Sequence, residues 1–302
     1  MQILIPAYRS RGTLLRAVKS LASQVEADSI SILIGDDSAD DSMTAELKEV
    51  SALNRTGFKI EIIKNNKNLG PFLNIVNLIT LATEPIVMLM PHDDYLIDPS
   101  FISRSLCAMS DGSVGIVVGN TIIEHSLKSS MAFSDSGFIK TSGESYISGP
   151  LWTHMHPAYS GVVLRLGQIN QEVIRDLYFG SFDINRFREQ GFSPDEGYLL
   201  LTLIALQSDV AITGKIVSVR GNAQDTYSKG KEWRDGYSEN ITATYYNLYA
   251  FGDRRGLDLV CGIAVYLLKH RYRNGLSPPP KCLHEYVYDK PCLDRFIRAI
   301  MD

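Results

Sequence analysis

Met88-Leu-Met-Pro-His-Asp-Asp-Tyr-Leu96 joins an apolar run to two adjacent carboxylates, Asp93 and Asp94. The run from Pro85 to Met90 is typical of a buried strand, and Pro91 ends it because proline lacks the N–H that a strand ladder needs. Burying charge is costly, so two neighbouring aspartates at the end of a core strand indicate either a turn or a site for a cation.

Short apolar runs rich in Ile and Val alternate with helical periodicity over the first 120 residues. The further strands that they predict are Ile3 to Ile5, Ile30 to Ile34, Phe58 to Ile63 and Gly115 to Val118. Apolar residues from Leu14 to Val25 and from Phe72 to Ala82 recur at three- and four-residue steps, which indicates amphipathic helices. This alternation predicts an α/β fold with a mainly parallel sheet that is flanked by helices.

Ligands of parallel sheets bind beyond the carboxyl ends of the strands, so the segments that follow the predicted strands form the candidate site. They are Pro6-Ala-Tyr8, Asp36-Asp37-Ser38, Asn65 to Pro71 and His92-Asp93-Asp94. All of them contain polar or conformationally special residues. We expect these segments to converge on one edge of the sheet.

The alternation fades after residue 120. Ser126 to Ser148 is rich in Ser, Gly and Lys and is expected to form a long loop. Pro194 to Gln207 predicts a helix, Val210 to Val219 predicts a strand, and residues 240–275 contain two predicted helices.

The composition excludes several classes of protein. A net charge of −4, with Lys and Arg scattered along the chain, provides no field for nonspecific binding of nucleic acid. The four cysteines form no CxxC pair, which argues against a zinc site or a disulfide framework and favours a reducing cytoplasm. No run of about 18 apolar residues predicts a membrane span, so we expect a soluble chain, or one that rests on a membrane surface.

Two adjacent aspartates offer hard oxygen ligands that suit Mg²⁺ or Mn²⁺, particularly when a diphosphate completes the coordination. Asp36 and Asp37 form a second acidic pair at the end of another predicted strand. A calcium loop that begins at Asp36 is excluded, because Asp41 stands where a glycine is needed and Leu47 where the bidentate glutamate belongs. A dinucleotide site is disfavoured, because the turn after the first strand has a single glycine, Gly12.

The segments at the strand ends resemble, in order and spacing, the consecutive motifs of family 2 glycosyltransferases. They are Ile3-Leu-Ile-Pro-Ala-Tyr8, Ile34-Gly-Asp-Asp-Ser38, Asn68-Leu-Gly-Pro-Phe-Leu-Asn74 and Met90-Pro-His-Asp-Asp94, and the likeness resumes at Ser160-Gly-Val-Val-Leu-Arg165 and Ser193-Pro-Asp-Glu-Gly-Tyr198. The resemblance implies a GT-A fold with a Rossmann-like sheet, a nucleotide-sugar donor, and inversion at the anomeric centre with bound Mn²⁺ or Mg²⁺.

The resemblance assigns the nucleobase to the ends of the first two strands. Pro6, Ala7 and Tyr8 would border the base, and Asp37, with Asp36 close by, would recognise it. A carboxylate can accept hydrogen bonds from the edge of a nucleobase.

The resemblance assigns the sugar and the metal to the next two strand ends. Asn68 and Gly70 would lie near the nucleotide and its sugar. Asp94 would be the principal metal ligand, and Asp93 would touch the ribose, the metal or the donor sugar. Family members often have another Asp two places before this pair, where this sequence has Pro91.

The family usually supplies its catalytic base from an acidic pair at the start of a helix. Asp195 and Glu196, just ahead of the apolar run Leu199 to Leu206, occupy that place. The position in the motif favours Glu196 as the base, and Asp195 stays a candidate because the order of the two residue types is reversed. Both would also suit the first turn of a helix that is capped by Ser193.

The histidines have weaker signals. His92 is expected to form a local hydrogen bond, because neutral imidazole suits Mg²⁺ less well than carboxylate. Trp152, His154 and His156 are expected to line an acceptor pocket or to form ordinary hydrogen bonds, with a metal site on the two histidines as the alternative. Some family members have a later histidine ligand after a Val-x-Arg segment, and Val217 to Gln224 contains none.

The expected organisation is a GT-A catalytic domain over residues 1–222, with a lid loop and a helical C-terminal extension over residues 223–302. Within the catalytic domain, residues 1–120 would bind the nucleotide sugar and residues 121–222 the acceptor.

Two segments of the extension have candidate roles. Tyr227 to Arg234 is basic and aromatic, and would form either a lid over the diphosphate or a solvated loop. Lys269 to Arg273 is a basic cluster at the end of an apolar helix. That helix would rest on an anionic membrane surface, pack on the catalytic domain or form a dimer contact.

The expected function is transfer of a sugar from a nucleotide-sugar donor, a UDP-sugar in the first instance, to a hydroxyl of a glycan or lipid-linked acceptor. The reaction would take place in the cytoplasm or at the inner face of the membrane. Assembly of a bacterial surface polysaccharide, such as O-antigen or capsule, follows from family analogy alone. The alternatives are a sugar nucleotidyltransferase or another metal-dependent nucleotide-processing enzyme, and a binding module without catalysis.

Overall fold

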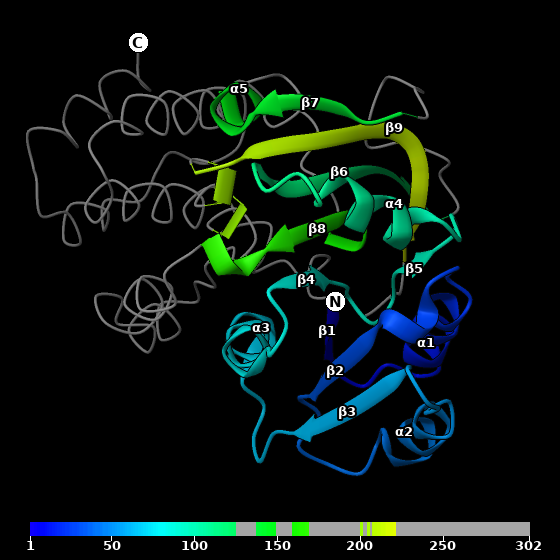
Figure 1. Cartoon of the computed structure of the whole chain (residues 1–302). Helices are drawn as coiled ribbons and strands as arrows, with labels where there is room; N and C mark the ends of the chain where they lie inside the picture. Colours follow the sequence, from blue (N-terminus) through cyan, green and yellow to red (C-terminus); the bar gives the residue numbers. More distant parts are fainter. Residues whose placement is uncertain (125–136, 149–158, 169–199, 202–203, 206, 222–302) are drawn as a thin grey trace, which may run out of the picture.

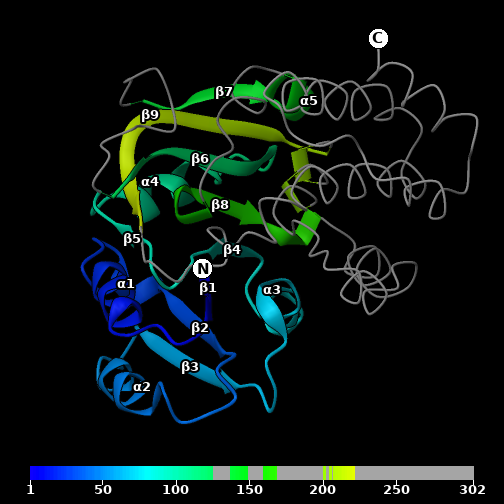
Figure 2. The same cartoon turned by 180° about the vertical axis from the view of Figure 1, so that it is seen from behind.

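A computed structural model describes residues 1–124, 137–148, 159–168, 200–201, 204–205 and 207–221 (Figures 1 and 2). Within these residues, one nine-stranded sheet forms the centre of the molecule. Its strands are β1 (Gln2–Ala7), β2 (Ser31–Asp36), β3 (Lys59–Lys64), β4 (Ile86–Leu89), β5 (Tyr95–Leu96), β6 (Val114–Ile123), β7 (Ile139–Ser142), β8 (Val162–Arg165) and β9 (Asp209–Arg220). The helices are α1 (Thr13–Ala22), α2 (Thr44–Ser51), α3 (Gly70–Leu81), α4 (Phe101–Ala108) and α5 (Gly143–Ser148), with the short 3₁₀ helices η1 (Ala27–Ser29), η2 (Tyr159–Gly161) and η3 (Leu166–Gln168).

Strands β3, β2, β1 and β4 lie side by side in that order and are parallel. β8 joins β4 in antiparallel orientation and connects it to β6, and β9 runs parallel to β6. β5 and β7 pair antiparallel with different parts of β9. β1, β2, β3, β4, β6 and β9 therefore run in one direction and end at the same edge of the sheet. The predicted fold class is confirmed.

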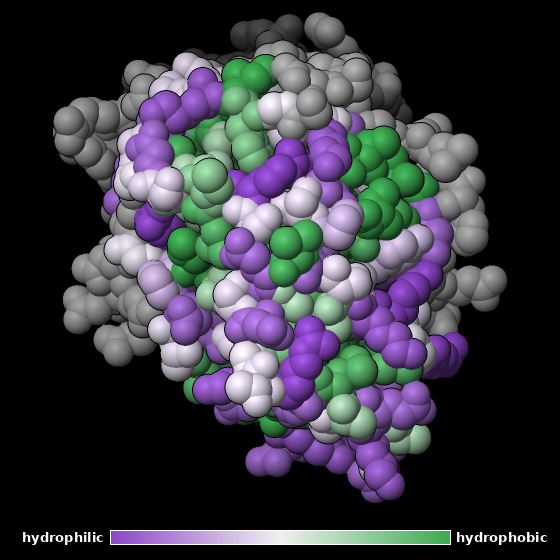
Figure 3. All heavy atoms as spheres, turned by 45° about the vertical axis from the view of Figure 1, so that its right-hand side comes forward, coloured by the Kyte–Doolittle hydropathy of each residue, from purple (hydrophilic) through white to green (hydrophobic). Residues whose placement is uncertain are grey.

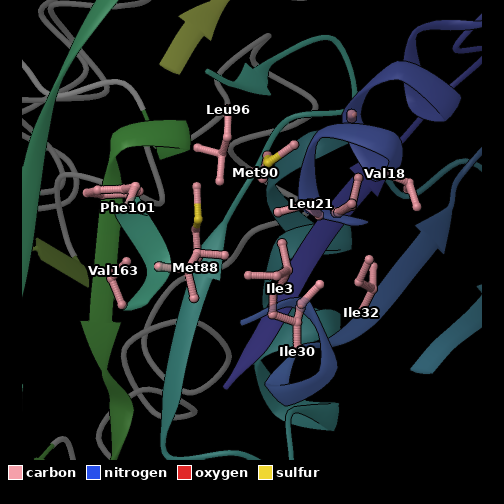
Figure 4. Close-up of a cluster of buried hydrophobic side chains, with 14 of the residues drawn as sticks. Ile3, Val18, Leu21, Ile30, Ile32, Met88, Met90, Leu96, Phe101 and Val163 are labelled. Carbon is pink, nitrogen blue, oxygen red and sulfur yellow. The ribbon is translucent and has the colours of Figure 1, made fainter. Parts of the chain in front are cut away.

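The two faces of the sheet are covered by different helices. Ile3 and Ile5 of β1 belong to a buried cluster with Leu21 of α1 and Phe101 of α4. Figure 4 shows this cluster at the sheet surface. The intervening Leu4 is fully buried on the opposite face, where α3 packs on β1 and β2 (Figures 1 and 2). Each fully buried Leu or Ile side chain contributes about 2 kcal/mol, which stabilises β1, β2 and β4, whereas β3 at the edge of the sheet has no buried residue.

Two sequence-based predictions about elements were wrong. The segment from 126 to 148 contains β7 and α5 instead of a continuous loop. β7 is mostly exposed, with Ile139 at 52%, and buried and exposed residues do not alternate along it. The strand is held by its pairing with β9. Val25 was included in the apolar face of the first helix, but α1 ends at Ala22 and Val25 is 70% exposed.

A bulge bends β9 towards the candidate site. Gly119 pairs with Thr213 and Asn120 with Ile216, so Gly214 and Lys215 are extra residues on β9. The side-chain amide of Asn120 donates to the carbonyl oxygen of Gly214 at 3.0 Å. After the bulge, the end of β9 lies between β6 and β5, next to the chain that follows β4.

The described surface mixes polar and apolar residues. Figure 3 shows hydrophobic residues in small groups between hydrophilic ones on the face that it presents. In the part of the chain that the structure describes, no helix combines the length and the apolar character that a membrane span requires.

Asp98 is expected to stabilise the fold in a pH-dependent way. Its carboxylate lies 2.8 Å from the guanidinium of Arg104 and 3.0 Å from the ammonium of Lys215. Burial alone would raise the pKa of Asp98, but hydrogen bonds from Lys215 and Ser100 hold it below its ordinary value. The stabilisation is therefore complete above the ordinary Asp pKa of roughly 4 and disappears as the pH falls through the lower pKa of the folded state.

Asp98→Asn should lower the free energy of unfolding by about 2 kcal/mol at pH 7, because the side chains of Arg104 and Lys215 lose their charged hydrogen-bond acceptor. Urea unfolding of both proteins across pH measures the difference, which should shrink below a pH of about 4. A difference that stays constant down to the lowest pH would contradict this role.

Candidate functional site

Pro6, Ala7 and Tyr8 lie at the carboxyl end of β1, as the sequence predicted. Ala7 is buried, and Tyr8 is 42% exposed at the edge of the sheet. The guanidinium of Arg9 lies 5.3 Å from the centre of the Tyr8 ring. An exposed ring at this edge can stack on a planar ligand.

The loop after β1 has an unusual backbone that is held by Glu46 of α2. Arg9, Arg11 and Gly12 have positive φ angles of 45°, 50° and 92°. The carboxylate of Glu46 accepts hydrogen bonds from the backbone N–H groups of Gly12 and Leu15, both at 2.9 Å. A left-handed conformation costs roughly 1–2 kcal/mol for a non-glycine residue, so these contacts offset the cost of the loop. The role of Glu46 could not be predicted from the sequence, because nothing in a helical Glu signals a contact with a distant loop.

Asp36 and Asp37 end β2 and are both almost fully buried. Asp36 accepts a hydrogen bond from the N–H of Ser38 at 3.0 Å. The carboxylate of Asp37 accepts from the N–H groups of Leu69 at 2.7 Å and Gly70 at 2.8 Å, at the start of α3. Asp37 therefore joins the end of β2 to the N-terminus of α3. Its contact with a nucleobase remains a prediction.

Asn68 and Gly70 lie beside this contact, where β3 leads into α3. The side-chain oxygen of Asn68 accepts from the N–H of Gly70 at 2.8 Å, and Gly70 has a φ of 79°, which favours glycine. Asn65 donates to Asp37 at 3.0 Å and to Asn74 at 3.2 Å. The segments after β2 and β3 thus form one hydrogen-bonded unit.

His92 forms a hydrogen bond, as expected, but its partner is 79 residues away in the sequence. Its Nδ1 lies 3.0 Å from the hydroxyl of Thr13 on α1. Burial lowers the pKa of His92, which keeps the ring neutral at pH 7. His92 thus ties the segment after β4 to the start of α1.

Asp93 and Asp94 lie at the end of β4, in a turn in which the N–H of Asp94 donates to the carbonyl oxygen of Pro91 at 3.1 Å. Asp93 is 6% and Asp94 is 3% exposed. Burial and the charge of Asp93 raise the pKa of Asp94 to about 7, against the lowering effect of hydrogen bonds from Gly221 and Ser160. Two buried carboxylates side by side are unfavourable without a positive partner.

The carboxylates of Asp93 and Asp94 suit a divalent cation that prefers oxygen ligands. In the described part of the chain, no residue donates a hydrogen bond to the Asp93 carboxylate, and Arg16 donates to the backbone oxygen of Asp93. The described residues contain no group of three or more His, Cys, Asp or Glu side chains placed to hold a metal ion. Two aspartates would therefore need further oxygen ligands, and the oxygens of a diphosphate meet that need.

Gly221, directly after β9, completes the surroundings of Asp94. Its N–H donates to the Asp94 carboxylate at 2.8 Å, across 127 residues of chain. A Cβ at this position would lie 2.1 Å from the backbone oxygen of Asp93, which is too close for any side chain. This segment contains no histidine ligand, and its contribution to the site is the backbone N–H of Gly221.

Gly221→Ala should weaken Mn²⁺-dependent nucleotide binding by about tenfold, because the added methyl group has to displace the aspartate turn. Calorimetric titration of UDP in the presence of Mn²⁺ measures the change. Gly112→Ala is the matched control, since its Cβ would meet no atom within 4 Å. Equal nucleotide affinity in Gly221→Ala and wild type would show that the close approach is unimportant.

Arg16 of α1 joins the ends of β4 and β6. Its guanidinium lies 2.7 Å from the carboxylate of Glu124 and donates to the backbone oxygen of Asp93 at 3.0 Å. The same group lies 4.4 Å from the ring centre of Tyr95. These contacts could not be predicted from the sequence, because a charged residue on a helix surface is ordinary.

Several predicted residues lie outside the described part of the chain. They are the candidate bases Asp195 and Glu196, the acceptor-side residues Trp152, His154 and His156, the lid segment from 227 to 234 and the basic cluster from 269 to 273. The described residues bring together the ends of β1, β2, β3 and β4, as predicted.

Comparisons with known proteins agree with this geometry. Residues 2–150 match the family model described as glycosyl transferase family 2. A comparison with curated protein sequences found no match.

Three solved structures illustrate the structural likeness. TarS from S. aureus aligns with a TM-score of 0.64 at 12% identity, over 99% of this chain and 49% of TarS, so the chain spans about half of that protein. A TarS structure in complex with UDP-GlcNAc aligns with a TM-score of 0.64 at 14% identity, over 99% of this chain and 81% of the other. The mannosyltransferase PcManGT from Pyrobaculum calidifontis, in complex with GDP-Man and Mn²⁺, aligns with a TM-score of 0.53 at 12% identity, over 99% of this chain and 85% of PcManGT.

At identities this low the structural likeness shows the fold alone, and the family match is confined to the N-terminal part of the chain. That match covers β1 to β4 and the segments after them that contain Tyr8, Asp37 and Asp94, whereas Gly221 after β9 lies outside it. The chain therefore has a GT-A fold, and its residues 2–150 match glycosyl transferase family 2.

Proposed function

We propose that the protein transfers a sugar from a nucleotide-sugar donor to an acceptor hydroxyl, with inversion of the anomeric centre and with Mn²⁺ or Mg²⁺ as cofactor. The observation that carries the proposal is the buried pair Asp93 and Asp94 at the edge where the parallel strands end. The pair is chemically incomplete without a cation, and a nucleotide diphosphate supplies the remaining oxygen ligands.

The positions of the strands support a nucleotide-sized donor. β1 lies between β2 and β4. At the usual spacing of neighbouring strands, the carboxyl ends of β2 near Asp37 and of β4 near Asp94 are therefore roughly 10 Å apart. A base held near Asp36, Asp37 and Tyr8 can therefore place its diphosphate near Asp93 and Asp94, with Asn68 and Gly70 beside the nucleotide. We propose a UDP-sugar as the donor, in line with the UDP-GlcNAc in the TarS structure, whereas PcManGT holds GDP-Man.

In the proposed mechanism, Glu196 or Asp195 accepts the proton of the acceptor hydroxyl while its oxygen attacks the anomeric carbon. Attack in line with the departing nucleotide inverts the anomeric centre in a single displacement. When bound, the divalent cation neutralises charge that develops on the diphosphate. Asp94 and Asp93 would hold the diphosphate at a constant distance from the acceptor through that cation.

The proposed setting follows from the family. We propose a glycan or lipid-linked acceptor, a cytoplasmic location with contact to the inner membrane face through the C-terminal residues, and a role in surface polysaccharide assembly. A homodimer through the same residues is part of this proposal. These assignments rest on the sequence of residues 223–302 and on family analogy.

A thermal-shift panel of UDP-, GDP-, CDP- and dTDP-sugars, with and without Mn²⁺, tests the donor and the cofactor. We expect one nucleotide to raise the melting temperature, and to do so more strongly with Mn²⁺, because a ligand that binds only the folded state stabilises it. Product analysis then separates the reaction types. Free nucleoside diphosphate with a glycosylated acceptor supports transfer, and release of sugar phosphate supports a nucleotide-processing enzyme instead.

A further inference from the structure

One side of α1 carries polar side chains that contact the chain after β4. Three of them recur at three- and four-residue steps along the helix, and a fourth lies just beyond its end. These residues are Thr13, Arg16, Ser20 and Gln24. Their partners follow in the same order, and are the ring of His92, the backbone oxygen of Asp93, the backbone N–H of Leu96 and the backbone oxygen of Asp98. The segment that contains the acidic pair is therefore aligned along α1, and β5 lies next to that helix (Figures 1 and 2).

Arg16 is the member of this series that contacts the acidic pair. One terminal nitrogen of its guanidinium donates to the backbone oxygen of Asp93 at 3.0 Å, and the group lies 4.4 Å from the ring centre of Tyr95. Asp93 and Tyr95 are the two chain neighbours of Asp94. A single guanidinium therefore contacts the chain on both sides of this aspartate.

Glu124, directly after β6, fixes the guanidinium. Its carboxylate accepts from the other terminal nitrogen of Arg16 at 2.7 Å. The backbone N–H of Glu124 donates to the carbonyl oxygen of Arg220 at 2.9 Å, and the next residue, Gly221, donates its N–H to the Asp94 carboxylate at 2.8 Å. A closed series of hydrogen bonds thus runs from α1 through the ends of β6 and β9 back to the turn after β4.

The positive charge of Arg16 is already paired. Its ion pair is with Glu124, and its hydrogen bond with Asp93 is to the backbone oxygen and not to the carboxylate. Together, Arg16 and Glu124 are neutral and add little to the electrostatic potential at the two aspartates. The contact therefore sets the position of the turn and leaves the buried carboxylates of Asp93 and Asp94 to a cation.

We propose that Arg16 is a positioning residue that holds Asp93 and Asp94 in the arrangement that binds the divalent cation. It acts through the backbone of Asp93, and a guanidinium is needed because one group has to reach Glu124, Asp93 and Tyr95 together. Groups that orient metal ligands typically change metal affinity by about 10- to 100-fold when they are lost. This inference rests on the metal role in the proposed function.

Arg16→Lys should weaken Mn²⁺ binding by about tenfold. Lysine keeps the positive charge and the aliphatic stem, but its ammonium lacks the fork that reaches two acceptors and the plane that stacks on a ring. A change in affinity therefore reports the geometry of the turn and not a loss of charge. The side chain of Arg16 is 40% exposed, and lysine forms helices about as well as arginine, so the variant should fold.

The dissociation constant of Mn²⁺ is measured by titration with electron paramagnetic resonance in the presence of UDP, with a protein-free titration of Mn²⁺ and UDP as the reference. Arg16→Gln adds a test of the sign of the effect. Loss of a positive charge near two carboxylates, with Glu124 left negative, should by itself tighten the binding of a cation. The positioning role predicts weaker binding instead, because glutamine cannot join Glu124 to Asp93. Binding as tight as in wild type, or tighter, would overturn the inference.

Arg104→Lys is the matched control. The guanidinium of Arg104 on α4 lies 2.8 Å from the carboxylate of Asp98 and 5.3 Å from the ring centre of Phe138, so it also combines an ion pair with a ring contact. Arg104→Lys should lower stability to urea by an amount similar to Arg16→Lys and leave Mn²⁺ affinity unchanged. A purely structural role of Arg16 would make the two variants alike in both measurements.

The outcomes separate the two proposals. If wild type does not bind Mn²⁺ with UDP, the metal role in the proposed function fails, and this inference fails with it. If wild type binds and Arg16→Lys binds equally well, the inference alone is overturned. Weaker Mn²⁺ binding in both Arg16 variants, with normal binding in Arg104→Lys, supports it.

Discussion

Asp94→Asn should lower kcat by about 1000-fold, equivalent to roughly 4 kcal/mol of transition-state stabilisation. The Asp94 carboxylate is 3% exposed, in the turn after β4, where it accepts a hydrogen bond from the N–H of Gly221. Asparagine keeps the shape of the side chain, but its neutral carbonyl oxygen is a weaker ligand for Mn²⁺ than a carboxylate. The departing diphosphate then loses most of its charge compensation. Release of nucleoside diphosphate from the donor identified by the thermal-shift panel measures kcat.

Asp98→Asn is the matched control for this experiment. Asp98 is another buried aspartate, four positions along the chain, and its partners are Arg104 and Lys215. Its replacement should reduce stability and leave kcat within about twofold at a temperature where both proteins are folded. Raising the Mn²⁺ concentration should restore part of the activity of Asp94→Asn, because weaker metal binding is the main defect. Wild-type turnover in Asp94→Asn would remove the metal from the mechanism.

Glu196→Gln should lower kcat by about 100- to 10,000-fold and leave the dissociation constant of the donor unchanged. Glutamine has the same shape as glutamate but cannot accept the proton of the acceptor hydroxyl. The donor contacts that we propose lie at the ends of β1 to β4 and do not involve this residue. Single-turnover kinetics with saturating acceptor, combined with calorimetric titration of the donor, separate the two quantities.

Asp195→Asn is the companion variant, since the two acidic residues are adjacent in the motif. We expect it to retain kcat within about tenfold, because asparagine removes a neighbouring charge without removing the base. The reverse pattern, with normal rates in Glu196→Gln and a large loss in Asp195→Asn, would assign the base to Asp195. Normal rates in both variants would place the base elsewhere in the chain.

The N-terminal half of the fold could be predicted because its signals are local. β1 to β4 are short apolar runs and α1 is a strongly periodic helix, so their types follow from nearby residues alone. β7 could not be predicted in this way. Its residues are mostly exposed, and it is a strand because β9 offers a free edge at Ile212 to Asp209.

The parts of the candidate site that directly follow the strands could also be predicted from the sequence. The rule that ligands lie at the carboxyl ends of parallel strands identified the segments with Tyr8, Asp37 and Asp94. It did not identify Glu46, which holds the loop after β1 from a helix 34 residues away from Gly12. Nor did it show that Asp37 caps α3, because an acidic residue after a strand has the same sequence signal in either role.

The sequence by itself determined the order of strands and helices and the place of the two acidic pairs at strand ends, since both depend on residues that are neighbours in the chain. Only the tertiary structure decided what surrounds Asp94. The bulge at Gly214 bends β9, and the pairing of β9 with β5 and β6 brings Gly221 to a carboxylate 127 residues earlier. Such contacts depend on the register of distant strands, and that register is set by packing across the whole sheet.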